Sequence, residues 1–169
     1  GHDYVDLGLS VKWATCNVGA SSPEECGIPY AWGEISADYS ASLYDYEHID
    51  NSGYIFIGYD ISGTRYDVAY KKWGTNWRMP TKDEMEELIN NCDWTKDYYN
   101  GEPCYKATGK NGNSIYFNVY CNHEGKHPRS YWSSTLCRTN QSCAYFMSVA
   151  DASSQNSIEY NRLRREDIL

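Results

Sequence analysis

Closely spaced carboxylates and a pair of histidines are the side chains of this sequence best suited to chemistry. The carboxylates are Asp83, Glu84, Glu86 and Glu87. Paired carboxylates can act as general acid and base, but these four lie at the start of a segment with helical periodicity. Acidic residues there favour the helix N-terminus and solvent, so a structural role is the favoured interpretation.

His123 and His127 flank a Gly-Lys pair and could bind a metal ion. Imidazole is a common metal ligand, but this spacing is typical of a loop, and a surface loop is favoured. The chain also has seven cysteines, an odd number that leaves at least one thiol free or paired outside the chain. None forms a CxxC motif or lies beside a histidine at zinc-ligand spacing. We therefore expect no metal, no cofactor and no catalytic residue.

Aromatic residues are abundant, with 17 Tyr, 3 Phe and six Trp. The tryptophans are Trp13, Trp32, Trp73, Trp77, Trp94 and Trp132. Aromatic faces can stack on sugar rings, but they also bury large areas in protein cores. Five of the six lie in motifs or at the ends of expected elements, so core packing is favoured over sugar binding.

The charge of the chain is acidic, with 23 Asp and Glu against 15 Lys and Arg, a net charge of −8. This balance argues against nucleic-acid binding. No apolar run approaches the roughly 18 residues of a membrane span. No signal peptide is visible, so we expect a mature or trimmed chain. The length of 169 residues predicts a single domain over 1–169.

The clearest expected element is a helix that begins at Thr81. Thr81 and Glu84 match a capping box, and Met85, Leu88 and Ile89 recur at helical spacing. We expect this apolar face to pack on a sheet that contains a hairpin over 104–120. A shorter helix is expected over 67–73, ended by a glycine.

The expected hairpin over 104–120 has a three-residue loop, Lys110-Asn111-Gly112. That loop pairs Ala107 with Ile115 and places both on one face. Further strands are expected over 4–7, 11–15, 131–135, 144–149 and 158–161, with another over 54–57 and a helical turn over 22–25. Because the helices precede most of the strands, the pattern predicts an α+β fold.

Five segments in this order resemble the Fibrobacter succinogenes major paralogous domain family, which is abundant in surface and secreted proteins of gut bacteria. They are YVDLGL (4–9), WATCNVGA (13–20), AWGE (31–34), WRMPT (77–81) and YWSST (131–135). The resemblance implies a C-type-lectin-like fold, with two main helices packed on a small, mostly antiparallel sheet and long loops.

The same resemblance implies an extracytoplasmic location. Members usually close with a Val-Arg-Pro-Val strand that pairs with the first strand, and this chain stops at Leu169, where that strand would begin. We expect the closing strand to be truncated or atypical. If a disulfide forms, Cys16–Cys92 is favoured, because both residues lie in framework segments of the family. The calcium-dependent lectin signatures are absent, although loop carbonyls could still bind calcium.

The family is distantly similar to sulfatase-modifying-factor proteins, whose Arg-Leu-Pro-Thr helix start resembles residues 78–81. Those enzymes hold copper between two late cysteines, which suggests Cys137 and Cys143 as a copper-thiolate site. Here the pair precedes the late strand, so a local disulfide or two plain thiols are favoured.

The expected ligand-binding face lies in the C-terminal third of the chain. Strand alternation separates Phe146 and Ser148 from Tyr145 and Met147, and the family pattern assigns the latter two to the core. Phe146 and Ser148 are therefore expected to be exposed. The expected basic residues beside them are Arg138, Arg162, Arg164 and Arg165. Such arginines suit carboxylates and sulfates.

Together these features predict a monomeric, non-enzymatic extracellular binding module for a glycan or protein ligand. A divergent copper-thiolate oxidase is one alternative. The other is a structural adhesin or fimbrial component in which a partner completes an open sheet edge. The C-terminal region also resembles variable regions that retroelements diversify in some C-type-lectin-like proteins.

Overall fold

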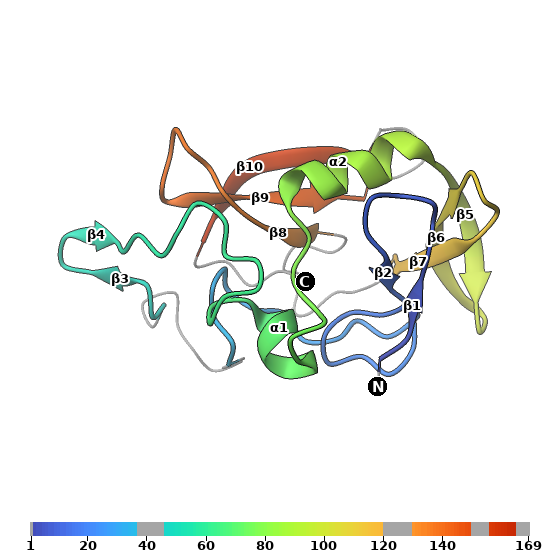
Figure 1. The fold of residues 1–169 in the computed structure, drawn as a ribbon, viewed down its shortest axis with the longest axis horizontal. Helices are drawn as coiled ribbons and strands as arrows, with labels where there is room; N and C mark the ends of the chain where they lie inside the picture. The colour runs from blue at the N-terminus through green and yellow to red at the C-terminus, as the bar shows by residue number, and fades with distance from the viewer. Residues whose placement is uncertain (1, 37–45, 120–129, 150–155, 165–169) are drawn as a thin grey trace.

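The computed structural model describes residues 2–36, 46–119, 130–149 and 156–164, and most of their regular structure is β (Figure 1). The strands are β1 (Tyr4–Val5), β2 (Trp13–Ala14), β3 (Ile49–Asp50), β4 (Gly53–Tyr54), β5 (Cys92–Tyr99), β6 (Glu102–Gly109), β7 (Ser114–Asn118), β8 (Ser130–Leu136), β9 (Cys143–Ser148) and β10 (Ser157–Leu163). The helices are α1 (Val68–Trp73) and α2 (Lys82–Asn91).

The expected α+β fold, with two main helices packed on a sheet, is wrong. Helices make up only 12% of the described structure, and the class is mostly β. Two local features keep the helices short. The chain leaves α1 at Gly74, which has a positive φ of 97°, and α2 passes directly into β5 at Cys92.

Both helix starts are as the sequence predicts. Asp67 caps α1 and accepts a hydrogen bond from the Tyr70 N–H. At α2 the reciprocal capping box of Thr81 and Glu84 is present. These caps satisfy N–H groups that a helix start leaves without an intrahelical partner.

Strands β5, β6 and β7 form an antiparallel sheet in that order. The β6–β7 register pairs Ala107 with Ile115, as predicted, and Gly112 has a φ of 87° in the loop. Strand β5 was not predicted. It joins β6 through Asn100-Gly101, both with positive φ, and such a pair suits the two-residue turn of a hairpin.

The second sheet has the order β10-β9-β8 and is covered on both faces. Figure 1 shows α2 running along it. On one face lies a core shared with α2, β6 and β7; on the other lies a core shared with the segment around Tyr30 and Trp32. The first core contains Leu7, Met85, Leu88, Cys92, Tyr105, Ala107, Ile115, Phe117, Tyr131, Met147 and Val149. The second contains Tyr30, Trp32, Ile61, Val68, Met79, Trp132, Leu136, Ala144 and Phe146.

The predicted burial of Met85 and Leu88 is confirmed, and Ile89 packs against the same core. The helix itself lies closer to the β10-β9-β8 sheet than to the β6–β7 hairpin. Its buried side chains nevertheless share one core with Ala107 and Ile115 of that hairpin.

The N-terminal segment is fastened to both ends of β7. At one end the Asn111 and Asn113 side-chain amides donate to the Asp6 carbonyl, at 2.9 and 2.8 Å. At the other end the Asn118 side-chain amide donates to the Glu24 carbonyl. These contacts hold the short β1–β2 pair opposite the β6–β7 hairpin.

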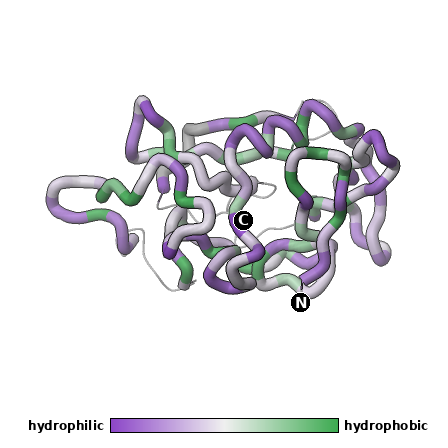
Figure 2. The backbone as a smooth tube through the Cα atoms, in the orientation of Figure 1, coloured by the Kyte–Doolittle hydropathy of each residue, from purple (hydrophilic) through white to green (hydrophobic). Residues whose placement is uncertain are grey.

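The chain carries its apolar residues in short runs. Figure 2 shows hydrophobic and hydrophilic residues alternating along the tube. Neither helix of the described structure is long and apolar enough to cross a membrane. Residues 22–25 form a turn rather than a helix, and the strand expected over 54–57 is reduced to Gly53–Tyr54.

Candidate functional site

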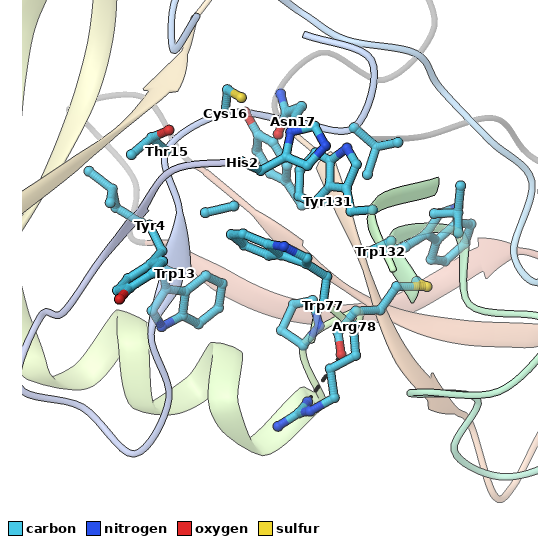
Figure 3. A pocket seen from close by; sticks show the side chains of 18 of the residues that line it. His2, Tyr4, Trp13, Thr15, Cys16, Asn17, Trp77, Arg78, Tyr131 and Trp132 are labelled. Carbon is cyan, nitrogen blue, oxygen red and sulfur yellow. Dashed lines mark hydrogen bonds between the residues drawn. The ribbon is translucent and has the colours of Figure 1, made fainter. Parts of the chain in front are cut away.

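A cavity of about 710 Å³ lies between the N-terminal segment, the 73–80 segment and the two larger sheets (Figure 3). Its walls are mainly aromatic and aliphatic. Four of the six tryptophans line it: Trp13, Trp73, Trp77 and Trp132. A concave, mostly apolar space with a few polar groups is typical of ligand-binding sites.

An aromatic cluster forms one wall of the cavity. The Trp73 and Trp77 rings meet edge to face, with centroids 5.1 Å apart. The His2 ring stacks on Trp73 at 4.3 Å. Tyr4 of β1 also lines the cavity, and its side chain is 56% exposed. The Lys12 ammonium lies 4.7 Å from the centre of the Tyr4 ring. The rim therefore offers flat aromatic faces to a ligand.

A buried carboxylate positions this wall. Asp67 is 0% exposed, and its side chain accepts from the N–H groups of Tyr70 (3.0 Å), Gly63 (2.8 Å) and Met79 (2.8 Å). Buried polar groups are tolerated when they are hydrogen-bonded in this way. The bond to Met79 ties the 73–80 segment to the start of α1.

An ion pair lies on the polar side of the rim. The Arg78 guanidinium donates to both oxygens of Glu84, at 2.8 and 2.5 Å. Burial alone would raise the pKa of Glu84, but the bonds from Arg78 and from the Thr81 N–H outweigh burial and lower that pKa. Glu84 therefore holds a charge that Arg78 neutralises, rather than serving as a free acid or base.

The floor of the cavity comes from β7, β8 and β9. Phe117 and Tyr131 meet edge to face at 5.2 Å, and Ile115 and Met147 complete the apolar surface. The Trp13 indole also lines the cavity, and its buried Nε1–H donates to no acceptor in the described part of the chain.

The structure contradicts the predicted C-terminal binding face. Phe146 is 1% exposed and meets Trp132 edge to face at 6.0 Å, and Arg164 is 0% exposed. Strand alternation does place Phe146 opposite Met147, but the second core covers that face of β9 as well. Neither Phe146 nor Arg164 can meet a ligand at the surface.

Of the other residues of that face, the two that the structure describes in full, Ser148 and Arg138, lie toward opposite ends of β9. Ser148 is half-buried at the end of β9. Arg138 is exposed, and its guanidinium lies 4.5 Å from the centre of the Tyr59 ring. Arg162 pairs with Ala144 in the β9–β10 register, but its side chain lies outside the described residues, as does the whole of Arg165.

Cys16 and Cys92, the pair favoured if a disulfide forms, are both free thiols, so the bridge is absent and the alternative of two thiols holds. Cys137 and Cys143 are also free and buried, and neither lines the cavity. Burial alone would raise the pKa of Cys137. Hydrogen bonds from the Thr139 hydroxyl and from nearby N–H groups outweigh burial, and the pKa lies below its usual value.

The carboxylates Glu86 and Glu87 have structural partners. Glu86 pairs with Lys82 at 2.7 Å, and Glu87 accepts from the Ser10 N–H at 3.0 Å. Within the described ranges no group of three or more His, Cys, Asp or Glu side chains could hold a metal ion. His123 and His127 lie outside the described residues.

Known proteins give no independent guide to this site. No protein-family model, curated protein or solved structure matches the chain. The family resemblance of the five segments stays a prediction, and the site has to be interpreted from its own geometry.

Proposed function

We propose that this chain is a non-enzymatic, extracytoplasmic binding module that holds a glycan or a protein segment in its aromatic-lined cavity. The cavity of about 710 Å³ is the observation that carries the proposal. It takes the place of the C-terminal face predicted from the sequence, whose Phe146 and Arg164 are buried.

The lining of the cavity supports binding more than catalysis. Aromatic rings such as Trp73 and Trp77 provide rigid contact area at low entropic cost, and the charged Arg78–Glu84 pair is satisfied internally. The net charge of −8 supports a ligand other than nucleic acid. The resemblance to a family of surface proteins supports the location, and we propose that the module acts as a monomer without a cofactor.

Two exposed tyrosines provide a matched test. Tyr4 is 56% exposed and lines the cavity, whereas Tyr98 is 70% exposed on β5 and lies outside it. The wild-type chain and the variants Tyr4→Ala and Tyr98→Ala would be applied to a glycan array and to an array of extended peptides. We expect wild-type binding to at least one class, about tenfold weaker binding by Tyr4→Ala, and no change for Tyr98→Ala.

Two outcomes would contradict the proposal. The first is the absence of wild-type binding on both arrays. The second is binding that Tyr98→Ala weakens and Tyr4→Ala leaves intact, because the ligand would then contact the β5 side of the molecule.

A further inference from the structure

The edge of β7 that faces away from β6 presents the backbone groups of Tyr116 at the cavity. In an antiparallel ladder, hydrogen-bonded residue pairs alternate with pairs whose backbone groups point away from each other. The Gly109 N–H donates to the Asn113 carbonyl at 2.9 Å. Gly109–Asn113 is therefore a hydrogen-bonded pair. Lys106–Tyr116 lies three pairs further along the register, so it is a pair without hydrogen bonds between its two residues. The N–H and C=O of Tyr116 therefore face away from β6.

The same argument applies to β2. The Thr15 N–H donates to the Asp3 carbonyl at 3.2 Å, so the next pair, Tyr4–Ala14, points away. The N–H and C=O of Ala14 face the free edge of β2. No backbone hydrogen bond in the described structure crosses from either edge to another strand.

Both free edges border the same cavity. Successive side chains of a strand alternate between its two faces. A strand whose face borders a cavity therefore lines it with every second residue, whereas a strand whose edge borders the cavity lines it with consecutive residues. Residues 11–18 and 115–117 line the cavity consecutively, whereas the β1 segment contributes only His2 and Tyr4. The cavity is thus bounded by the β2 edge and the β7 edge, above an apolar floor.

We infer that the occupant of this cavity is an extended segment of another polypeptide, which adds a strand to β7 along the edge at Tyr116. This inference rests on the proposed function and names its ligand class. A strand that matches residues 114–117 of β7 spans about 14 Å. Backbone hydrogen bonds to an edge strand give such complexes their affinity, and pockets for alternate side chains give specificity.

The chemistry of the walls defines the pattern of that segment. Ile115 and Phe117 line the cavity beside this edge and also pack into the first core, so alternate residues of the added strand that lie next to them would be apolar. The Lys, Arg, Asp and Glu residues of the lining are Lys12, Glu34 and the Arg78–Glu84 pair, whose formal charges cancel, whereas the whole chain carries a net charge of −8. An acidic module favours a neutral or basic partner, so the segment alternates apolar and polar residues and carries lysine or arginine at its ends.

Tyr116 allows a test of the edge itself. Its ring lies on the far side of the strand, 4.9 Å from the Tyr99 ring. Both Tyr116→Pro and Tyr116→Ala remove this ring, but only the proline variant also removes the outward N–H. An edge strand tolerates proline where the missing N–H faces away from the ladder. The probe is a fluorescent peptide of alternating valine and threonine with lysine at both ends, measured by fluorescence anisotropy.

We expect Tyr116→Pro to bind this peptide about tenfold more weakly than Tyr116→Ala. A second arm uses the wild-type chain, and so does not depend on how the proline variant folds. The same peptide with alternate amides N-methylated keeps its side chains but loses half of its N–H donors. It should bind about tenfold or more weakly.

Three results would overturn the inference: equal affinity for the parent and N-methylated peptides, equal affinity of the two Tyr116 variants, or no peptide binding. If no peptide binds while Tyr4→Ala weakens glycan binding on the array, the strand inference fails and the proposed function stands. Self-association of the chain that the peptide disperses, observed by sedimentation velocity, would identify a second copy as the occupant and overturn the inference as stated.

Discussion

The guanidinium of Arg164 lies 4.9 Å from the centre of the Trp32 ring, in the interior of the protein. The Trp32 N–H donates to the Arg164 carbonyl at 2.8 Å. The Arg164 side chain donates to the Ile55 carbonyl at 2.9 Å and to the Tyr46 hydroxyl at 3.1 Å. Burial raises the pKa of Tyr46 well above its ordinary value, so this hydroxyl stays neutral. Arg164 therefore joins the end of β10 to three earlier parts of the chain.

Replacing Arg164 with lysine should destabilise the fold by about 2–4 kcal/mol, because lysine cannot reproduce a planar fork that both stacks and donates to several acceptors. Arg138→Lys is the matched control, since Arg138 is exposed, and its effect should stay within about 0.5 kcal/mol. Urea denaturation measures both. Equal midpoints for the two variants would show that Arg164 does not hold these segments together.

Leu88 is 0% exposed in the core under α2. Leu88→Ala should lower the free energy of unfolding by about 2–5 kcal/mol, through lost burial and the cavity left behind. Asn90→Ala, at an exposed position of the same helix, should change it by about 0.5 kcal/mol or less. Similar losses in the two variants would place the helix outside the core.

The pair formed by Glu84 and Arg78 should make stability depend on pH. The folded-state pKa of Glu84 is lowered, so its contribution is present above the unfolded pKa of about 4.3 and is lost as pH falls through the folded pKa. Glu84→Gln should cost about 1 kcal/mol at neutral pH and progressively less in acid.

Denaturation curves of the wild type and Glu84→Gln at several pH values measure this difference. As a control, Glu86→Gln breaks the more exposed pair with Lys82 and should cost about 0.5 kcal/mol or less. A Glu84→Gln effect that is constant from neutral to acid pH would contradict the account.

The thiols of Cys16 and Cys92 should both react with an alkylating reagent when the protein is unfolded without a reductant, because neither forms a disulfide. Mass spectrometry of the digested protein identifies the labelled peptides. A reductant-sensitive species joining the two cysteine peptides would show that the bridge expected from the family resemblance forms after all.

Local signals in the sequence predicted several elements well. The Thr81–Glu84 capping box, the loop ending at Gly112 and the burial of Leu88 follow from short-range rules that neighbouring structure does not override. Strand β5 was missed although Asn100-Gly101 is a hairpin signal. β5 is an edge strand with many exposed residues, and most of those residues are polar. The sequence therefore lacks the apolar alternation that indicates a strand.

The C-terminal face shows where sequence reasoning fails. Alternation along β9 correctly separates Phe146 from Met147, but it cannot show that a second core covers the other face of the sheet. The cavity was missed for a similar reason. Its walls join Tyr4, Trp77 and Phe117 from distant parts of the chain, and no spacing along the sequence brings these residues together.

Amide hydrogen exchange of the chain, with and without the alternating valine–threonine peptide, tests the central claim most directly. The account predicts slower exchange in β7, centred on Tyr116, because its outward N–H group becomes hydrogen-bonded to the added strand. Exchange in β5, the other edge strand of the same sheet, should not change. Protection confined to β5, or no protection at a peptide concentration that saturates binding, would contradict the claim that the cavity receives a strand.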